Sequence, residues 1–323
     1  DLLCLTHPGQ PSAEIASLVI FSLSPRLIGR SQEYGIVRRT RAPNHWQTIR
    51  RLGHQHNFYT MDITGPVVLI SDLHLTAEDP TGLECFYAFA QQVQGVEQLY
   101  ILGDLFEYWI GDDSAEALGL TGVCVALKRL NESGTKITLM TGNRDFLLGQ
   151  DFCRSTGCQL LQEPAEAEIS GHLILLQHGD KLCTDDINHQ RHRAIVDQPS
   201  WRKTFLNRTF SQRQSLAQAG RSQSEAGKRY KSADIMDVND AAVESTFLNS
   251  RGSLLIHGHT HRPGIHAVTL KNRTAWRIVL GDWSAGPSYV SAASQRIDLH
   301  FKEQVLSLSQ SEEDPTLRLH HDA

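Results

Sequence analysis

Residues 67–75 read VVLISDLHL, and this segment guides the interpretation of the rest of the chain. Its first half, Val67–Ile70, is an apolar and mostly β-branched run, which predicts a strand buried on both faces. Asp72 and His74 follow two positions apart, and in an extended chain residues i and i+2 point to the same side. We therefore expect a carboxylate and an imidazole to leave the end of a core strand together, as a pair of metal ligands.

Downstream of this segment, predicted strands alternate with predicted helices, which indicates a layered α/β domain. A period-2 pattern at Ser294–Phe301 predicts additional antiparallel pairing near the end. Helices are predicted at Glu84–Val93 and at Leu118–Glu132, with Gly134 as the stop signal of the second. Further strands are predicted at Gln98–Leu102, Lys136–Met140, Leu173–Gln177, Ser253–Ile256, Ala275–Leu280 and Val290–Leu299.

The composition of the 323 residues argues against several classes of protein. Apolar residues make up 40%, as in a globular protein, and no apolar run approaches the length that a membrane span needs. The net charge of −5, from 31 basic and 36 acidic residues, argues against a nucleic-acid-binding protein. The six cysteines are irregularly spaced with no C-x-x-C pair, which favours reduced, mostly buried thiols in the cytosol over a disulfide framework or a zinc knuckle.

The two ends of the chain differ from the middle. Residues 1–60 are interrupted by prolines and basic runs and lack a helical apolar stripe, so they are expected to be a non-native or disordered extension, with Met61 as the natural start. An internal methionine after a disordered arm is the alternative. The functional domain is then expected at residues 61–310, followed by a polar tail at 311–323.

A helical segment without strand signals, residues 187–245, interrupts the α/β pattern and predicts an inserted cap over the ends of the sheet. Residues 191–231 contain ten Lys or Arg but only two acidic residues. The charge could be a solvated helix face, or it could hold an anionic amphiphile with the help of apolar side chains. Those apolar side chains are Trp201, Phe205, Leu206, Phe210 and Leu216.

Polar clusters follow the predicted strands at each carboxyl end, which is where ligands bind in open α/β sheets. The expected ligand set is Asp72, His74, Asp104, Asn143, His178, His259 and His261. Seven oxygen and nitrogen donors exceed the need of one tetrahedral zinc and suit two divalent cations that share a carboxylate, with Mn²⁺ favoured because no thiolate is present. The glycines before Asp104, Asn143 and His259 are expected to let the backbone turn sharply.

These clusters together resemble the calcineurin-like metallophosphoesterases. The resembling motifs are D-x-H, G-D-x-x-E, G-N-x-D, H-G-D and G-H-x-H, over roughly residues 66–285. The resemblance implies a layered β-sandwich flanked by helices, with the cap inserted. Two departures stand out: Glu107 replaces the usual second Asp of G-D-x-x-D, and Arg144 replaces the histidine that generally assists the leaving group.

Longer strings resemble those of one family within this group, the UDP-2,3-diacylglucosamine pyrophosphatases of lipid A biosynthesis in Gram-negative bacteria. They are ILGDLFEYWIGDD, GNRDFLLG, HGDKLCTDD, IMDVN and IHGHTHRP, within residues 66–301. The resemblance implies hydrolysis of the pyrophosphate to UMP and 2,3-diacylglucosamine 1-phosphate by metal-activated water. It also implies an acylated UDP-sugar substrate and a peripheral position on the anionic inner face of the inner membrane, with no nucleic-acid or obligate protein partner.

The same resemblance implies roles for individual residues. Asp72, His74, Asp104 and His261 would hold one metal, and Asp104, Asn143, His178 and His259 the other, with Asp104 bridging. The residues implied in catalysis are Asp104, Asn143, Arg144 and His259. Those implied in substrate binding are Asn143, Arg144, Asp186, Ser224, Lys228, Lys231 and His259.

Several alternatives stay open at this stage. Arg144 has the fork geometry that binds a phosphate oxygen, but it could instead only pair with Asp145. The generic motifs also allow a metallophosphoesterase that acts on nucleotides or cyclic nucleotides. A non-catalytic scaffold of the same fold is a third possibility, although such a protein should have lost metal ligands, and none is missing here.

Overall fold

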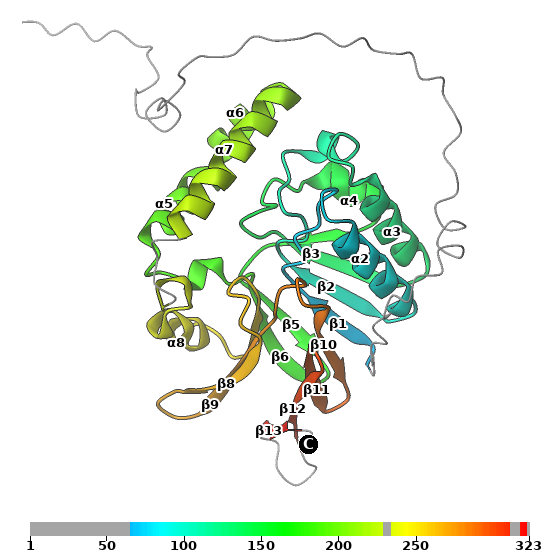
Figure 1. Ribbon diagram of the computed structural model, residues 1–323. Coiled ribbons are helices and arrows are strands. Elements are labelled where there is room, and N and C mark those ends of the chain that lie inside the picture. The colour runs from blue at the N-terminus through cyan, green and yellow to red at the C-terminus, as the bar shows by residue number, and fades with distance from the viewer. Residues whose placement is uncertain (1–64, 229–233, 311–316, 322–323) are drawn as a thin grey trace, which may run out of the picture. The chain divides into compact units, whose positions relative to one another are not determined.

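Two β-sheets packed face to face form the centre of the described chain, and helices cover their outer faces (Figure 1). The computed structural model describes residues 65–228, 234–310 and 317–321, without the side chains of residues 223–228, 234 and 321. The larger sheet has eight strands in the order β13-β12-β11-β10-β1-β2-β3-β4, and the smaller has five in the order β5-β6-β7-β9-β8. The predicted layered α/β sandwich is confirmed.

Strand β1, Val67–Ile70, lies in the interior of the larger sheet, parallel to β2 and antiparallel to β10. Its side chains alternate between two apolar cores, because Leu69 packs between the sheets whereas Val68 and Ile70 pack against the helices. The other strands of this sheet are β2 Gln98–Leu102, β3 Lys136–Met140, β4 Gln159–Leu161, β10 Ser288–Ala293, β11 Arg296–Phe301, β12 Gln304–Ser309 and β13 Arg318–His321.

Helices α2, Pro80–Gln92, α3, Thr121–Glu132, and α4, Gln150–Thr156, cover the outer face of the larger sheet (Figure 1). The predicted first helix starts earlier than expected, since the Asp79 side chain accepts a hydrogen bond from the Gly82 N–H and Pro80 occupies the first turn. The predicted second helix starts three residues later than expected, at Thr121, and ends at Glu132 as predicted.

The smaller sheet comprises β5 Ala165–Ile169, β6 His172–Leu176, β7 Leu254–His257, β8 Gly264–Thr269 and β9 Thr274–Val279. Helix α8, Asp240–Leu248, covers its outer face, where Val243 and Phe247 pack against Leu255. The described part of the chain therefore has four layers: helices, sheet, sheet and helix. The predicted run Val290–Leu299 is two strands rather than one, because a turn at Ser294 and Gln295 joins β10 to β11 in an antiparallel hairpin.

The predicted cap is helical, with α5 Ile187–Val196, α6 Pro199–Leu206, α7 Phe210–Lys228 and the 3₁₀ turn η4 Asp234–Met236 preceding α8. Its aromatic residues are less exposed than the sequence suggested. Phe205 is buried, and Trp201 stacks on it with ring centroids 4.9 Å apart and also contacts Phe146 of the α/β domain. Among the five apolar positions named above, Leu206 alone is exposed.

Ion pairs also hold the cap in place. Arg213 of α7 is 3% exposed, and it donates from Nη1 to Asp113 Oδ1 at 2.8 Å and to the Ile110 carbonyl oxygen at 2.5 Å. Arg193 of α5 is buried as well. Two of the ten basic residues counted in the sequence are therefore structural.

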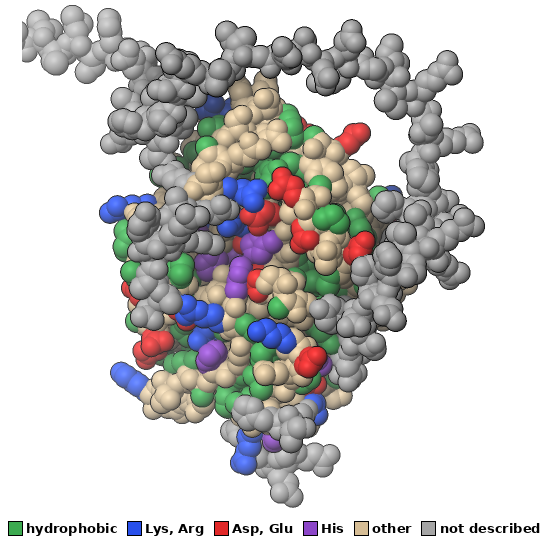
Figure 2. Space-filling view, in the orientation of Figure 1, with side chains coloured by type: hydrophobic (Ala, Val, Ile, Leu, Met, Phe, Trp, Pro, Cys, Tyr) green, Lys and Arg blue, Asp and Glu red, His purple; other side chains and the backbone are tan. Residues whose placement is uncertain are grey.

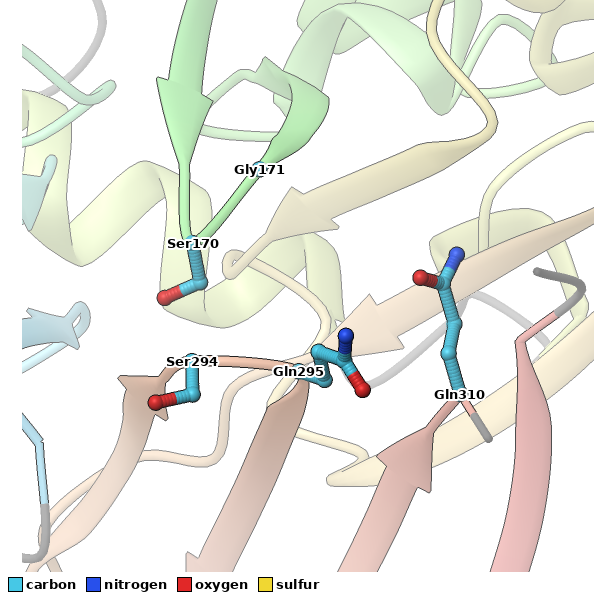
Figure 3. A pocket seen from close by; sticks show the side chains of 5 residues that line it. All are labelled: Ser170, Gly171, Ser294, Gln295 and Gln310. Carbon is cyan, nitrogen blue, oxygen red and sulfur yellow. The ribbon is translucent and has the colours of Figure 1, made fainter. Parts of the chain in front are cut away.

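A shallow pocket of about 710 Å³ lies at the far ends of the strands from the predicted ligands (Figure 3). Two hairpin turns and Gln310 line it, through Ser170, Gly171, Ser294 and Gln295. These turns precede β6 and follow β10, whereas the predicted ligands follow β6 and β1. The pocket contains no metal-ligating side chain and is not the functional site.

Candidate metal centre

The seven predicted ligands lie directly after five strands. Asp72 and His74 follow β1, Asp104 follows β2, and Asn143 follows β3. In the smaller sheet, His178 follows β6, and His259 and His261 follow β7. Strands β1, β2 and β3 are mutually parallel, as are β6 and β7, so their carboxyl ends bring the ligands to one edge. Figure 2 shows histidine and acidic side chains gathered in the middle of one face.

The backbone at five ligands is left-handed, which the sequence did not reveal. The φ angles are 55° at Asp72, 50° at His74, 51° at Asp104, 67° at His259 and 56° at His261. Asp72 and His74 are therefore not an extended i, i+2 pair as predicted, since β1 ends at Ile70. Left-handed non-glycine residues are strained, and such strain concentrates at functional sites.

Two of the three glycines that precede ligands serve close approach rather than a sharp turn. Gly103 does have a positive φ of 91°, but Gly142 and Gly258 do not. A Cβ on Gly142 would lie 2.2 Å from Asp104 Oδ1, and one on Gly258 would lie 2.0 Å from Asp72 Oδ2. The loops after β3 and β7 therefore need glycine so that they can pack directly against the carboxylates of other loops.

One ligand group contains Asp72, His74 and His261, whose ligand atoms all lie within 4.8 Å of one another. The Nε2 atoms of the two histidines are 3.3 Å apart, and His261 Nε2 lies 3.3 Å from Asp72 Oδ1. His74 is oriented from behind by Glu107, whose Oε2 lies 3.0 Å from His74 Nδ1. This contact directs His74 Nε2 towards the group.

The second ligand group contains Asp104, His178 and His259, with ligand atoms within the same 4.8 Å limit. Asn143 joins it, because its Oδ1 lies 3.0 Å from His178 Nε2. The two groups meet at one oxygen: Asp104 Oδ2 is 3.6 Å from His178 Nε2 and 3.9 Å from His74 Nε2. Asp104 therefore lies between the two ligand groups.

Several hydrogen-bond acceptors face one another at the site, which favours the binding of cations between them. His178 Nδ1 lies 2.9 Å from the Leu102 carbonyl oxygen, so it donates, and in the neutral ring the lone pair of Nε2 would point towards the oxygens of Asn143 and Asp104. The Nε2 lone pair and both of these oxygens are hydrogen-bond acceptors. In the first group, Asp72 Oδ1 is buried and makes no well-formed hydrogen bond among the described residues. Both groups thus have the oxygen and nitrogen donors that bind divalent cations.

The pKa values of the metal-free protein reflect the same crowding of acceptors. Burial opposes protonation of His178, but the carboxylates of Asp104 and Asp72 outweigh it and raise its pKa to about 9. Burial and the neighbouring His178 instead lower the pKa of His259. Burial acts to raise the pKa of Asp72, but the contact with His261 and the charge of His178 lower it well below its usual value. In the metal-free protein, a proton on His178 therefore offsets part of the negative charge that a cation would offset.

Arg144 lies beside the centre and is not paired with Asp145, so that alternative is wrong. Asp145 is fully buried and accepts hydrogen bonds from the Gly142 N–H and the Leu105 N–H, both at 2.8 Å, which joins the loops after β2 and β3. The Arg144 N–H donates to Asp104 Oδ1 at 2.8 Å, and its Nη1 lies 3.5 Å from Glu107 Oε1. The guanidinium is partly exposed at the site.

A polar network lies under the second ligand group and was not predicted from the sequence. Asp180 is buried, and its Oδ2 lies 2.8 Å from Arg193 Nε and 3.1 Å from His189 Nε2. The His189 ring in turn packs against the ring of His259, with centroids 5.4 Å apart. The i, i+4 spacing of His189 and Arg193 on one helix was the available signal.

The predicted substrate contacts in the cap are only partly described. Asp186 caps α5, since its Oδ1 accepts a hydrogen bond from the His189 N–H at 3.1 Å. Ser224 and Lys228 belong to α7, but their side chains lie outside the described part of the structure. Lys231 lies outside the described residues altogether.

Comparisons with known proteins agree with this geometry. The family model described as calcineurin-like phosphoesterase matches residues 65–263. The chain is 45% identical to the UDP-2,3-diacylglucosamine hydrolase of Aromatoleum aromaticum, over 69% of this chain and 91% of the relative. It is 44% identical to the enzyme of that name from Nitrosococcus oceani, over 72% of this chain and 93% of the relative. It is 42% identical to that of Serratia proteamaculans, over 72% of this chain and 97% of the relative.

Proposed function

The chain belongs to the calcineurin-like phosphoesterase family, and from this premise we propose that it hydrolyses the diphosphate bond of UDP-2,3-diacylglucosamine in lipid A biosynthesis. The products are UMP and 2,3-diacylglucosamine 1-phosphate. The observation that carries the proposal is the pair of ligand groups that share Asp104 Oδ2, with Arg144 beside them where the wider family generally has a histidine. The names of three relatives at 42–45% identity support the substrate.

In this proposal the first group, completed by Asp104, would hold one Mn²⁺, and the second group, completed by Asn143, would hold another. Bound cations of this kind activate water and withdraw charge from phosphate oxygens. The chain supplies the orientation: Glu107 and the Leu102 carbonyl contact the Nδ1 atoms of His74 and His178, which leaves both Nε2 atoms directed towards the ligand groups. The left-handed backbone at the ligands supports such preorganisation.

Arg144 is proposed to bind the diphosphate. Its backbone N–H donates a hydrogen bond to Asp104, and its guanidinium forms an ion pair with Glu107. A positive charge is therefore held in place next to the Asp104 carboxylate. A guanidinium stabilises charge but does not deliver a proton at neutral pH. This suits a leaving group that is itself a phosphate ester, which departs without protonation. Asn143 and His259 are proposed to contact the same substrate. The residues proposed to bind it from the cap are Asp186, Ser224, Lys228 and Lys231.

The acylated substrate also implies a membrane surface. No helix in the described residues is long and apolar enough to cross a membrane. The first two cap helices carry exposed apolar side chains, among them Ile187 and Ile195 of α5 and Leu206 of α6. With the exposed Lys and Arg of the cap, they support a peripheral position on the anionic cytoplasmic face of a Gram-negative inner membrane. We propose no nucleic-acid or obligate protein partner.

The direct test is release of UMP from UDP-2,3-diacylglucosamine by the Mn²⁺-loaded protein. We expect steady UMP release, and little turnover of ordinary nucleotides or cyclic nucleotides under the same conditions. Absence of UMP release would overturn the proposal. Turnover of nucleotides instead would indicate another phosphoesterase, and two-metal loading without hydrolysis of any of these compounds would indicate a scaffold.

Arg144→Ala should lower kcat by about 10²-fold while both cations stay bound, since the variant removes an electrostatic contact but no ligand. Steady-state kinetics and elemental analysis after dialysis measure the two quantities. Arg154→Ala, which removes an exposed arginine of α4, is the matched control and should behave as the wild type. Loss of metal in Arg144→Ala would show that the residue is structural.

A further inference from the structure

Glu107 is the meeting point of three basic side chains from different parts of the chain. Its Oε2 lies 3.0 Å from His74 Nδ1. Its Oε1 lies 3.0 Å from Arg221 Nη2 and 3.5 Å from Arg144 Nη1. The carboxylate is largely shielded, with 17% of its side chain exposed, so these contacts are only weakly screened by solvent. Both oxygens are thus engaged.

Arg221 comes from the cap rather than from the α/β domain. It belongs to α7, which also buries Arg213 against the loop after β2. The Arg221 guanidinium lies 5.2 Å from the ring centroid of Tyr108, the residue next to Glu107, so a cation–π contact holds it in place. A carboxylate on one side and an aromatic face on the other define its position.

A continuous chain of contacts therefore runs from the cap to a metal ligand. Arg221 contacts Glu107, Glu107 Oε2 lies 3.0 Å from His74 Nδ1, and His74 Nε2 lies 3.9 Å from one oxygen each of Asp72 and Asp104. Outer partners of this kind set the tautomer and ring orientation of a metal-bound histidine. The glutamate side chain, one methylene longer than aspartate, lets one carboxylate contact both a ligand and the cap.

We propose that Glu107 and Arg221 are positioning residues through which the cap supports the first ligand group. Cation affinity at this group then depends on how α7 packs against Glu107, although neither ligand group found in the described residues includes a cap residue. The inference rests on the proposed function only in requiring a divalent cation at this group, not in requiring the lipid substrate.

Titration of the metal-free full-length protein with Mn²⁺, followed by calorimetry and by the electron paramagnetic resonance of Mn²⁺, tests this without substrate. Glu107→Gln offers a single acceptor and no charge, so it should weaken binding of one of two Mn²⁺ ions by about 10–100-fold. Arg221→Met keeps an unbranched side chain next to Tyr108 but removes the guanidinium. This variant should weaken the binding of the same Mn²⁺ ion, by a smaller factor than Glu107→Gln does.

The double variant Glu107→Gln/Arg221→Met separates a contact that acts through Glu107 from a general loosening of the cap. If Arg221 acts through Glu107, the double variant should bind Mn²⁺ no more weakly than Glu107→Gln alone. Arg154→Met serves as the control and should bind Mn²⁺ as the wild type does. Normal Mn²⁺ affinity in Arg221→Met, or fully additive losses in the double variant, would overturn the inference. Failure of the wild type to release UMP would leave these binding results unchanged, so the two proposals fail separately.

Discussion

Asp104→Ala should reduce UMP release by at least about 10³-fold, because both ligand groups depend on this side chain. Asp104 Oδ2 lies close to a histidine of each group, at 3.6 Å from His178 Nε2 and 3.9 Å from His74 Nε2. Its Oδ1 also accepts the Arg144 N–H at 2.8 Å, so the variant releases the loop that carries the arginine. Elemental analysis should find fewer than two Mn²⁺ per chain, together with the loss of UMP release.

Two further variants keep this result interpretable. Asp104→Asn retains the shape of the side chain but not its charge, so it should fold normally and still lose metal. Asp151→Ala removes an exposed carboxylate from α4 and should leave both metal content and activity unchanged. Full metal loading of Asp104→Ala would show that Asp104 does not bridge two cations.

Gly258→Ala should disrupt the centre without altering any ligand. The new Cβ would lie 2.0 Å from Asp72 Oδ2 and 2.2 Å from Ser71 Oγ, so the buried carboxylate has to move. The same oxygen accepts the His259 N–H at 2.8 Å, which connects the clash to the second ligand group. We expect weaker Mn²⁺ binding and a free energy of unfolding lower by about 1–3 kcal/mol, as for other overpacked interiors. Calorimetry and denaturant unfolding measure these effects.

Gly220→Ala is the matched glycine control. This residue lies within α7, and a Cβ built on it meets no atom within 4 Å. The substitution should leave Mn²⁺ binding unchanged and stabilise the helix by roughly 0.5–1 kcal/mol. Wild-type Mn²⁺ affinity in Gly258→Ala would mean that the loop after β7 can move away from Asp72 at little cost.

Strands with a strong apolar pattern could be predicted closely, and weakly patterned strands could not. Gln98–Leu102 and Lys136–Met140 occupy the predicted positions, because the second, fourth and fifth residues of each strand are apolar and buried. Strand β5 reads AEAEI and was not predicted, since glutamate is depleted in strands. Pairing with β6 makes it a strand. Strands β4, β8, β12 and β13 were missed as well.

The sequence by itself determined which residues gather at the centre, because each ligand follows a strand and parallel strands end at a common edge. The tertiary structure decided how they are held. It shows the left-handed backbone at Asp72 and His74 and the close approach of glycines to the carboxylates. It also shows the contact of Glu107 with the cap residue Arg221. Strand periodicity and chain order are local properties that a sequence displays directly. The distance between Arg221 and Glu107 depends on how α7, which is far away in the sequence, packs against the loop after β2, and only the folded chain determines this packing.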